Sequence, residues 1–163
     1  MIFEKPRKSR RRILREKALQ ILYGNELNKE NLDTTIKQVL GDVNFSDREF
    51  SLKLVNSVIE NQKELENLIV KKLSNWELER IALIDRLLLR LGIAEMLFFP
   101  EIPPKVTMNE MIEIAKEYST AKSGKFINGI LDAILNDLKK SNKLKKSGRG
   151  LIEQSFHKKS SGE

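Results

Sequence analysis

The segment from Ile81 to Leu97 constrains the fold most, because it is apolar on nearly every side of a helix. Its apolar members are Ile81, Leu83, Ile84, Leu87, Leu88, Leu89, Leu91, Ile93, Ala94 and Leu97. A helix that is hydrophobic all round is normally buried among other elements. The segment therefore predicts a central helix that the rest of the chain must cover.

The covering elements also have helical periodicity. Apolar residues recur at spacings of three and four, which is typical of amphipathic helices, whereas alternation with a period of two is absent. We expect these helices over about residues 9–27, 32–40, 46–73, 107–118 and 123–138. The polar stretch 60–64 leaves open a break near Asn61 or one bent helix. The sequence predicts an all-α fold.

Short local motifs suggest where the helices begin and end. Pairs of Ser or Thr with Glu three residues later indicate capping boxes, in which each side chain satisfies a free backbone donor of the other residue. These pairs are Ser46 with Glu49, Ser74 with Glu77, and Thr107 with Glu110. Gly41 suits a left-handed C-terminal cap, and Ser123 is a candidate cap of the last helix. The prolines of residues 99–104 predict a loop.

Charge divides the chain into three parts. Residues 1–20 and residues 139–163 each carry eight basic and two acidic residues, whereas the whole chain carries +7, so residues 21–138 carry −5. We expect a basic N-terminal arm over 1–8, one helical domain over 9–140, and a basic, disordered tail over 141–163. Basic ends favour a polyanionic partner such as nucleic acid, and the alternative is that they only confer solubility.

Several function classes are excluded or weakened. Cysteine is absent and His157 is the only histidine, so a thiol nucleophile, a thiolate metal site and histidine catalysis within the fold are ruled out. Ser123-Gly124-Lys125 resembles the end of a phosphate-binding loop, but residue 119 is serine where that motif needs glycine. We therefore expect no enzyme, no cofactor and no metal.

Neither a signal peptide nor a window of about 18 apolar residues is visible, so we expect a soluble, cytoplasmic protein that is not embedded in a membrane.

Charged residues inside the most apolar helix need partners, because an unpaired buried charge is very costly. The residues concerned are Asp85, Arg86, Arg90 and Glu95. Structural pairing is the simpler interpretation for most of them. For Asp85 a functional role stays open.

Four blocks of this sequence, in this order, resemble the signature blocks of the NusB family. They are Arg15-Glu16-Lys17-Ala18-Leu19-Gln20-Ile21-Leu22-Tyr23, Asp85-Arg86-Leu87-Leu88-Leu89-Arg90-Leu91-Gly92-Ile93-Ala94-Glu95, Asn109-Glu110-Met111-Ile112-Glu113-Ile114-Ala115-Lys116 and Lys125-Phe126-Ile127-Asn128-Gly129-Ile130-Leu131-Asp132. One such block is weak, but four ordered blocks over about residues 10–138 are specific.

The resemblance implies an all-α, NusB-like fold of about seven helices in two packed sub-bundles. It also implies a role in transcription antitermination. Members pair with NusE, a small-subunit ribosomal protein, and bind the boxA element of ribosomal RNA leader transcripts. The complex then helps RNA polymerase to read through terminators.

The expected RNA surface combines the basic first helix with residues carried over from the family. Single-stranded RNA is held by cations on phosphates, by aromatic rings that stack on bases, and by polar groups that contact base edges. The candidate residues are Arg11, Arg12, Arg15, Gln20, Tyr23, Asp85, Lys122, Lys125 and Phe126. The alternative interpretations are that Tyr23 and Phe126 are core or capping aromatics and that Asp85 pairs with an arginine.

Two other functions compete with antitermination. A NusB-like domain can recruit RNA for a ribosomal RNA methyltransferase, but this chain has neither a glycine-rich cofactor loop nor a cysteine. The chain could instead be a structural or homodimer-forming helical protein that binds RNA only non-specifically. For NusE we expect a surface on the central helices and the acidic middle, since an acidic face suits a basic ribosomal protein.

Overall fold

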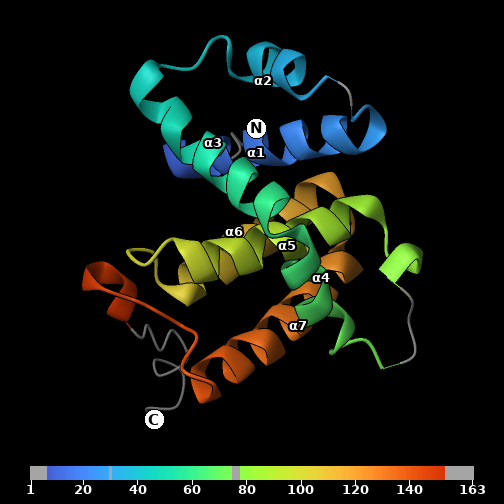
Figure 1. The fold of residues 1–163 in the computed structure, drawn as a ribbon, viewed down its shortest axis with the longest axis vertical. Helices are drawn as coiled ribbons and strands as arrows, with labels where there is room; N and C mark the ends of the chain where they lie inside the picture. The colour runs from blue at the N-terminus through green and yellow to red at the C-terminus, as the bar shows by residue number, and fades with distance from the viewer. Residues whose placement is uncertain (1–6, 30, 75–77, 153–163) are drawn as a thin grey trace, which may run out of the picture.

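The computed structural model describes residues 7–29, 31–74 and 78–152. All secondary-structure elements within these ranges are helices, joined by loops (Figure 1). The α-helices are α1 Arg10–Leu27, α2 Leu32–Leu40, α3 Phe45–Glu60, α4 Gln62–Val70, α5 Leu83–Phe98, α6 Pro104–Tyr118 and α7 Ala121–Lys140. Two short 3-10 helices are η1 Leu78–Arg80 and η2 Gly148–Leu151. None of the described helices has the length and apolar character needed to cross a membrane.

The helices form two sub-bundles that meet at α5. Helix α1 packs against α2 and α3, whereas α5, α6 and α7 pack against one another with α4 beside them (Figure 1). Helix α5 also contacts α1 and α3 of the first sub-bundle. The predictions of an all-α fold of about seven helices and of two packed sub-bundles are confirmed.

The predicted central helix is α5, and every residue from Leu87 to Met96 in it is buried. Gly92 allows α7 to pack closely here, because a Cβ at this position would lie 2.9 Å from Cδ1 of Leu131. A side chain at residue 92 would force the tightly packed side chain of Leu131 to shift. The apolar character of this segment thus determines its central place.

A buried ion pair joins the two sub-bundles. Arg15 of α1 donates from Nε and Nη2 to the two carboxylate oxygens of Glu95 in α5, at 2.8 and 2.7 Å. Thr107 of α6 donates its hydroxyl to the same carboxylate at 2.7 Å. Arg15 is 3% exposed and Glu95 is fully buried. Bidentate geometry and a third donor are the conditions under which such a pair can be buried.

Part of the predicted boundaries is correct. Ser9 caps α1, because its side chain accepts a hydrogen bond from the backbone N–H of Arg12 at 3.1 Å. The open question at Asn61 is settled as a break, since α3 ends at Glu60 and α4 begins at Gln62. Helix α2 ends at Leu40 as expected.

The expected caps elsewhere are wrong. Gly41 is right-handed at φ −58°, α3 begins after Asn44 rather than at Ser46, and α6 begins three residues before Thr107. Pro104 starts α6 because its fixed φ suits the first turn of a helix. The hydroxyl of Thr107 serves the buried Glu95, whose demand for donors is stronger than that of a helix end.

Two further caps also differ from expectation. The capping side chain of α7 is Thr120, which accepts from the backbone N–H of Ser123 at 3.1 Å, so Ser123 lies inside the helix. Glu77 of the Ser74 box lies outside the described residues, and α5 begins only at Leu83.

Residues 141–152, here called the C-terminal strap, are packed rather than disordered. The ammonium of Lys146 donates to the backbone carbonyl of Phe99 at 2.9 Å. The backbone N–H of Ser147 donates to the backbone carbonyl of Pro100 at 3.0 Å. Gly150 fits only because it lacks a side chain, since a Cβ there would lie 1.9 Å from the carbonyl oxygen of Pro100. The predicted disorder therefore does not hold for residues 141–152, and residues 153–163 lie outside the described part.

We predict that Arg15→Met costs about 3–5 kcal/mol of unfolding free energy, because it leaves the carboxylate of Glu95 buried without its cation. Arg12→Met, which breaks a partly exposed pair, should cost about 1 kcal/mol or less. Urea unfolding followed by circular dichroism measures both values. Arg15→Met combined with Glu95→Met should recover most of the loss, and equal costs for the two single variants would contradict the prediction.

We also predict a pH effect at the strap. Burial lowers the pKa of Lys146 to about 8, whereas an unfolded lysine keeps a value of about 10.4. Between these values the unfolded state binds more protons, so the unfolding free energy of the wild type should rise with pH relative to Lys146→Met. Urea unfolding of both proteins at pH 7 and pH 10 checks this. A constant difference between them would show that the ammonium is not desolvated.

Candidate RNA interface

The cations of the first helix are mostly engaged within the protein. Arg12 donates from Nε and Nη2 to Glu110 of α6 at 2.7 and 3.1 Å. Lys8, just before α1, lies 2.9 Å from Glu16 and 2.8 Å from Glu117, and these bonds raise its pKa above the ordinary lysine value. The basic helix thus carries much less free charge than its sequence suggests.

The guanidinium of Arg15 is buried, whereas that of Arg11 is accessible to a partner. Arg15 was expected to contact phosphate, but it lies in the core with both ends of its fork on Glu95. We therefore remove Arg15 from the candidate RNA-binding residues. Arg11 is exposed, and its guanidinium lies 4.0 Å from the ring centroid of Phe50. A stacked guanidinium keeps its edge N–H groups available to a phosphate.

An exposed stripe runs along α1. Gln20 is exposed, and Ile13, Tyr23 and Leu27 are 41%, 39% and 67% exposed. Residues separated by seven or fourteen positions share one helix face, so Ile13, Gln20 and Leu27 align and Tyr23 lies beside them. Tyr23 is therefore not a core aromatic. An apolar and aromatic stripe of this kind can hold unstacked bases or another protein.

Asp85 lies at a small pocket at the start of α5. It is 7% exposed, and its Oδ2 accepts a hydrogen bond from the hydroxyl of Ser123 at 2.8 Å. Its Oδ1 has no hydrogen-bond partner within the described part of the chain. Asp85 lies in the first turn of α5, where the helix dipole favours a carboxylate. Among the described residues no arginine forms an ion pair with Asp85, in contrast to the alternative interpretation.

The pocket beside Asp85 has a volume of about 270 Å³ and is lined by Arg80, Ile81, Ala82, Asp85 and Phe126. Phe126 is half-buried, so part of its ring faces the pocket. An aromatic ring, a carboxylate oxygen without a donor and an arginine form a site that could hold a planar group bearing an amino substituent.

Two lysines flank this pocket on α7. Lys122 and Lys125 are exposed, and neither forms an ion pair with another described residue. They come from the same first turns of α7 that supply Ser123 and Phe126. The structure thus gathers Asp85, Lys122, Lys125 and Phe126 around the starts of α5 and α7.

Helix α6 connects this group with the first helix. The hydroxyl of Tyr118, at the end of α6, lies 3.5 Å from the carboxylate of Glu16 in α1, and α7 begins three residues later. Gln20 and Tyr23 follow Glu16 by one and two helical turns. The candidate interface therefore comprises the outer stripe of α1 and the starts of α5 and α7.

Sequence reasoning missed several supporting residues. Ser119 and Thr120 contact the hydroxyl of Ser123 at 2.9 and 3.0 Å, which orients Ser123 towards Asp85. The Ser119-Thr120 pair before α7 was a visible signal of this hydroxyl cluster. Arg80 and the exposed Ile13 had no signal, because only the folded chain shows which side chains border a pocket.

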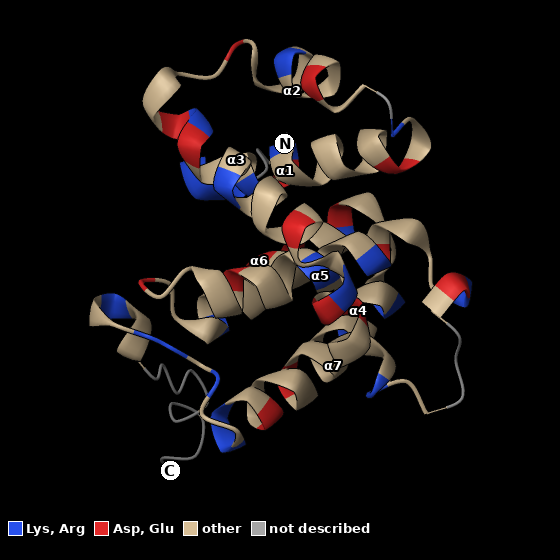
Figure 2. Cartoon of the chain, viewed as in Figure 1, with Lys and Arg blue, Asp and Glu red and all other residues tan. Residues whose placement is uncertain are grey.

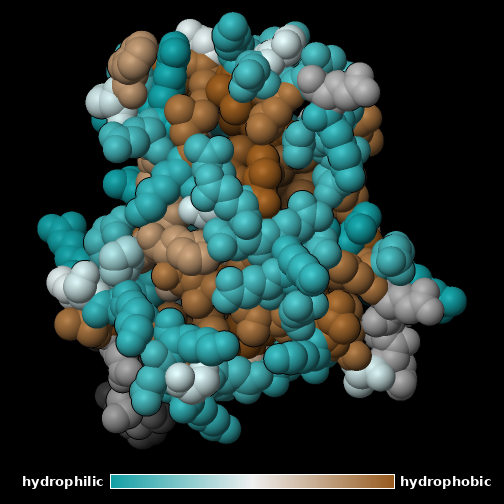
Figure 3. Space-filling model, viewed as in Figure 1, coloured by the Kyte–Doolittle hydropathy of each residue, from teal (hydrophilic) through white to brown (hydrophobic). Residues whose placement is uncertain are grey.

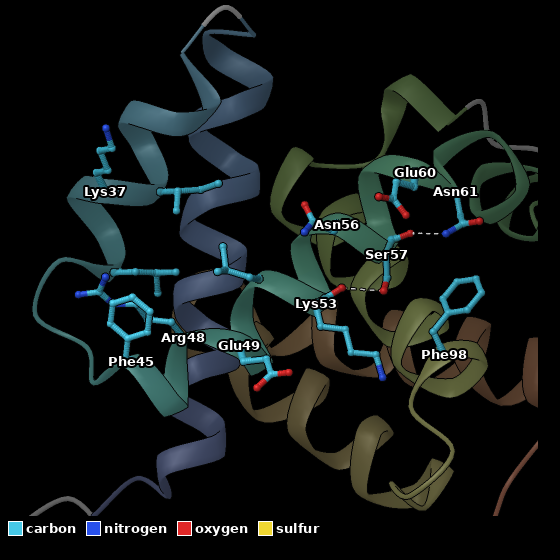
Figure 4. A pocket seen from close by; sticks show the side chains of 13 residues that line it. Lys37, Phe45, Arg48, Glu49, Lys53, Asn56, Ser57, Glu60, Asn61 and Phe98 are labelled. Carbon is cyan, nitrogen blue, oxygen red and sulfur yellow. Dashed lines mark hydrogen bonds between the residues drawn. The ribbon is translucent and has the colours of Figure 1, made fainter.

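A second, larger hollow lies between α2 and α3. It has a volume of about 1020 Å³, and Figure 3 shows an apolar, hollowed region there. Figure 4 shows Phe45, Arg48, Glu49, Lys53 and Phe98 along it, with cations and carboxylates on the same rim. Because its charges are mixed, this groove suits a protein segment better than a polyanion.

Fold and surface together define an all-helical binding protein, and no group of side chains suited to hold a metal ion occurs among its described residues. The chain belongs to the NusB family, whose model matches residues 12–136. Members are transcription antitermination factors, so the resemblance and the prediction that the chain is not an enzyme are confirmed.

Individual relatives agree with this assignment. The chain is 49% identical over 146 residues to the transcription antitermination protein NusB of Chloroherpeton thalassium, covering 88% of this chain and 69% of the relative. It is 44% identical to that of Salinibacter ruber, covering 88% and 92%.

Solved structures of the family share the fold. T. maritima NusB is 34% identical with a TM-score of 0.74, covering 80% of this chain and 93% of that one. A chain from the complex of antitermination factors NusB and NusE with double-stranded RNA is 31% identical with a TM-score of 0.71, covering 78% and 97%.

Proposed function

We propose that this chain binds the boxA element of ribosomal RNA leader transcripts together with NusE. In this proposal it acts in the cytoplasm as part of an RNA polymerase complex that reads through terminators. Membership of the NusB family and the related NusB–NusE complex with RNA support the proposal. The observation that carries it is the unpartnered Oδ1 of Asp85 beside Phe126.

In this proposal one set of residues binds the phosphates of the RNA and another set binds its bases. Lys122 and Lys125 contribute free charge to phosphates, and Arg11 adds its exposed guanidinium. Phe126 and Tyr23 stack on unpaired bases. Asp85 accepts a hydrogen bond from the amino group of a base, which gives the site sequence preference.

Arg12 and Gln20 complete the edge of this surface. Arg12 binds Glu110 through Nε and Nη2, so its Nη1 keeps donors for a phosphate without breaking the ion pair. Gln20 offers both a donor and an acceptor from the exposed stripe of α1. Binding is thus built mainly on a preformed surface, which lowers the entropic cost of complex formation.

We further propose that NusE docks on the acidic side formed by α3 and α4. Glu49 and Glu60 border the apolar groove between α2 and α3, and Glu64 lies in the first turn of α4. All three carboxylates are exposed. The groove also carries Lys37, Arg48 and Lys53, so the acidic attraction in this proposal comes from these three exposed carboxylates and the apolar groove supplies surface for apolar side chains of the partner.

The alternative function, a homodimer-forming protein with only non-specific RNA binding, has one observation in its favour. Ile13 and Leu27 expose apolar surface on α1. Light scattering at increasing protein concentration, with and without RNA, separates the two. A dimer that persists with RNA, together with equal affinity for boxA and scrambled RNA, would support the alternative.

We predict that Phe126→Ala and Tyr23→Ala each weaken boxA RNA binding by about 5-fold to 100-fold, the effect of removing one stacked base contact. Phe45→Ala is the matched control, because Phe45 is an 87% exposed aromatic in the groove away from this surface. Fluorescence anisotropy with boxA and scrambled RNA measures the affinities. An equal effect of all three variants would argue against stacking at Phe126 and Tyr23.

We predict that Glu49→Lys, Glu60→Lys and Glu64→Lys in one protein weaken NusE binding at least about 10-fold, because like charges then face each other. A variant with Glu101→Lys, Glu113→Lys and Asp132→Lys changes the same charge at exposed positions elsewhere. Isothermal titration calorimetry with NusE compares the two. If both variants bind NusE like the wild type, the proposed acidic docking side is wrong.

A further inference from the structure

Exposed cations without an ion pair are concentrated at the C-terminal end of the described fold, whereas most cations at the first helix are paired. Residues 139–152 contain six basic and no acidic residues. Five of them are exposed and are here called the strap cations: Lys139 and Lys140 at the end of α7, directly before the strap, and Lys143, Lys145 and Arg149 within it. None of the five forms an ion pair within the described ranges, whereas Lys8, Arg12, Arg15 and Lys17 all do.

The strap holds these cations in a defined place. Lys146, the sixth basic residue, donates to the carbonyls of Phe99 and Glu95 and so caps the end of α5. Leu144 packs against the core, and Gly150 lies against Pro100. These residues attach the strap on its inner side, and the strap cations are exposed. Figure 2 shows Lys and Arg along the described part of the strap, which contains no acidic residue.

A groove runs beside the strap cations. It has a volume of about 520 Å³ and lies between the start of α6, the end of α7 and the strap. Lys105 and Lys139 line it from α6 and α7, and Leu135, Leu144, Leu151 and Ile152 add apolar surface. None of the described residues that line this groove is acidic. Its chemistry fits an anionic chain with apolar parts.

Helix α7 links this region to the candidate RNA interface. Lys122 and Lys125 lie on its exposed face near its start, and Lys139 and Lys140 lie on the same face near its end. Fourteen residues separate Lys125 from Lys139, which is about 20 Å along a helix. Between these lysines α7 carries two acidic residues, Asp132 and Asp137, and Asp137 pairs with Lys72 of the chain segment after α4.

We propose that the strap cations and Lys105 form a second RNA-binding surface, which takes the phosphates of RNA flanking the segment held at α1, α5 and α7. The proposal rests on the proposed RNA-binding function and extends it. RNA is the partner that the observations favour, because one helix, α7, carries cations of both surfaces, Lys122 and Lys125 near its start and Lys139 and Lys140 at its end. No aromatic side chain among the described residues lines the groove, so we expect this contact to be independent of base sequence.

The experiment compares two RNAs, a short one that contains only the boxA element and a longer one with flanking nucleotides on each side. Lys145→Gln with Arg149→Gln alters the strap, and Lys29→Gln with Lys37→Gln removes the same charge from exposed positions near α2. A fourfold variant adds Lys140→Gln and Lys143→Gln to the strap pair. Lys146 stays unchanged in all proteins because it caps α5.

We expect the strap variants to weaken binding of the long RNA and to leave the short RNA unchanged. The slope of log affinity against log salt should fall by about 3 in the fourfold variant, given about 0.7 per phosphate contact of a single strand. Changing the flanking sequence should not alter the effect. The control pair should bind both RNAs like the wild type.

The outcomes separate the two proposals. If the wild type binds the short boxA RNA no better than a scrambled one, the proposed function fails. If the short RNA binds specifically but the fourfold strap variant binds the long RNA like the wild type, only the second surface is refuted. Chemical acetylation of lysines, measured by mass spectrometry, adds a direct readout. The long RNA should protect Lys139, Lys143 and Lys145 from acetylation, and the short RNA should not.

Discussion

The buried pair of Arg15 and Glu95 is the interaction on which the two sub-bundles depend. It joins α1 to α5, and Thr107 brings α6 to the same carboxylate. Desolvating these charges is costly, so the pair is stable only when all three helices present their groups in the right geometry. The stripe of α1 is thereby held in a fixed orientation relative to the starts of α5 and α7, where the candidate RNA interface lies.

The fold could be predicted well because its signal is repeated along the chain. The apolar segment of α5 alone implied a central helix, and the amphipathic segments implied the helices that surround and bury it. The exact starts of α3, α6 and α7 could not be predicted, because a Ser or Thr followed by Glu says nothing about competing partners. Thr107 and Ser123 serve the buried Glu95 and Asp85, and only tertiary structure brings these groups together.

The sequence indicated which residues make up the candidate site, but not which of its cations are already paired within the protein. Arg15, Arg12 and Lys8 are alike in sequence, yet one is buried, one is half-buried and one bridges two carboxylates. Their partners lie about 80 to 110 positions away for the long-range pairs, so no local pattern reveals them. Conversely, the strap was expected to be disordered from its composition, although Leu144 and Gly150 anchor it.

The strap also sets an order of events during synthesis. The end of α5 at Phe99 receives its capping ammonium from Lys146, which is 47 residues later in the chain. While the ribosome is still making α6 and α7, the carbonyls at the end of α5 lack that partner and depend on water. The second sub-bundle therefore acquires its final contacts only as the last residues emerge, whereas the α1–α3 sub-bundle is synthesised well before.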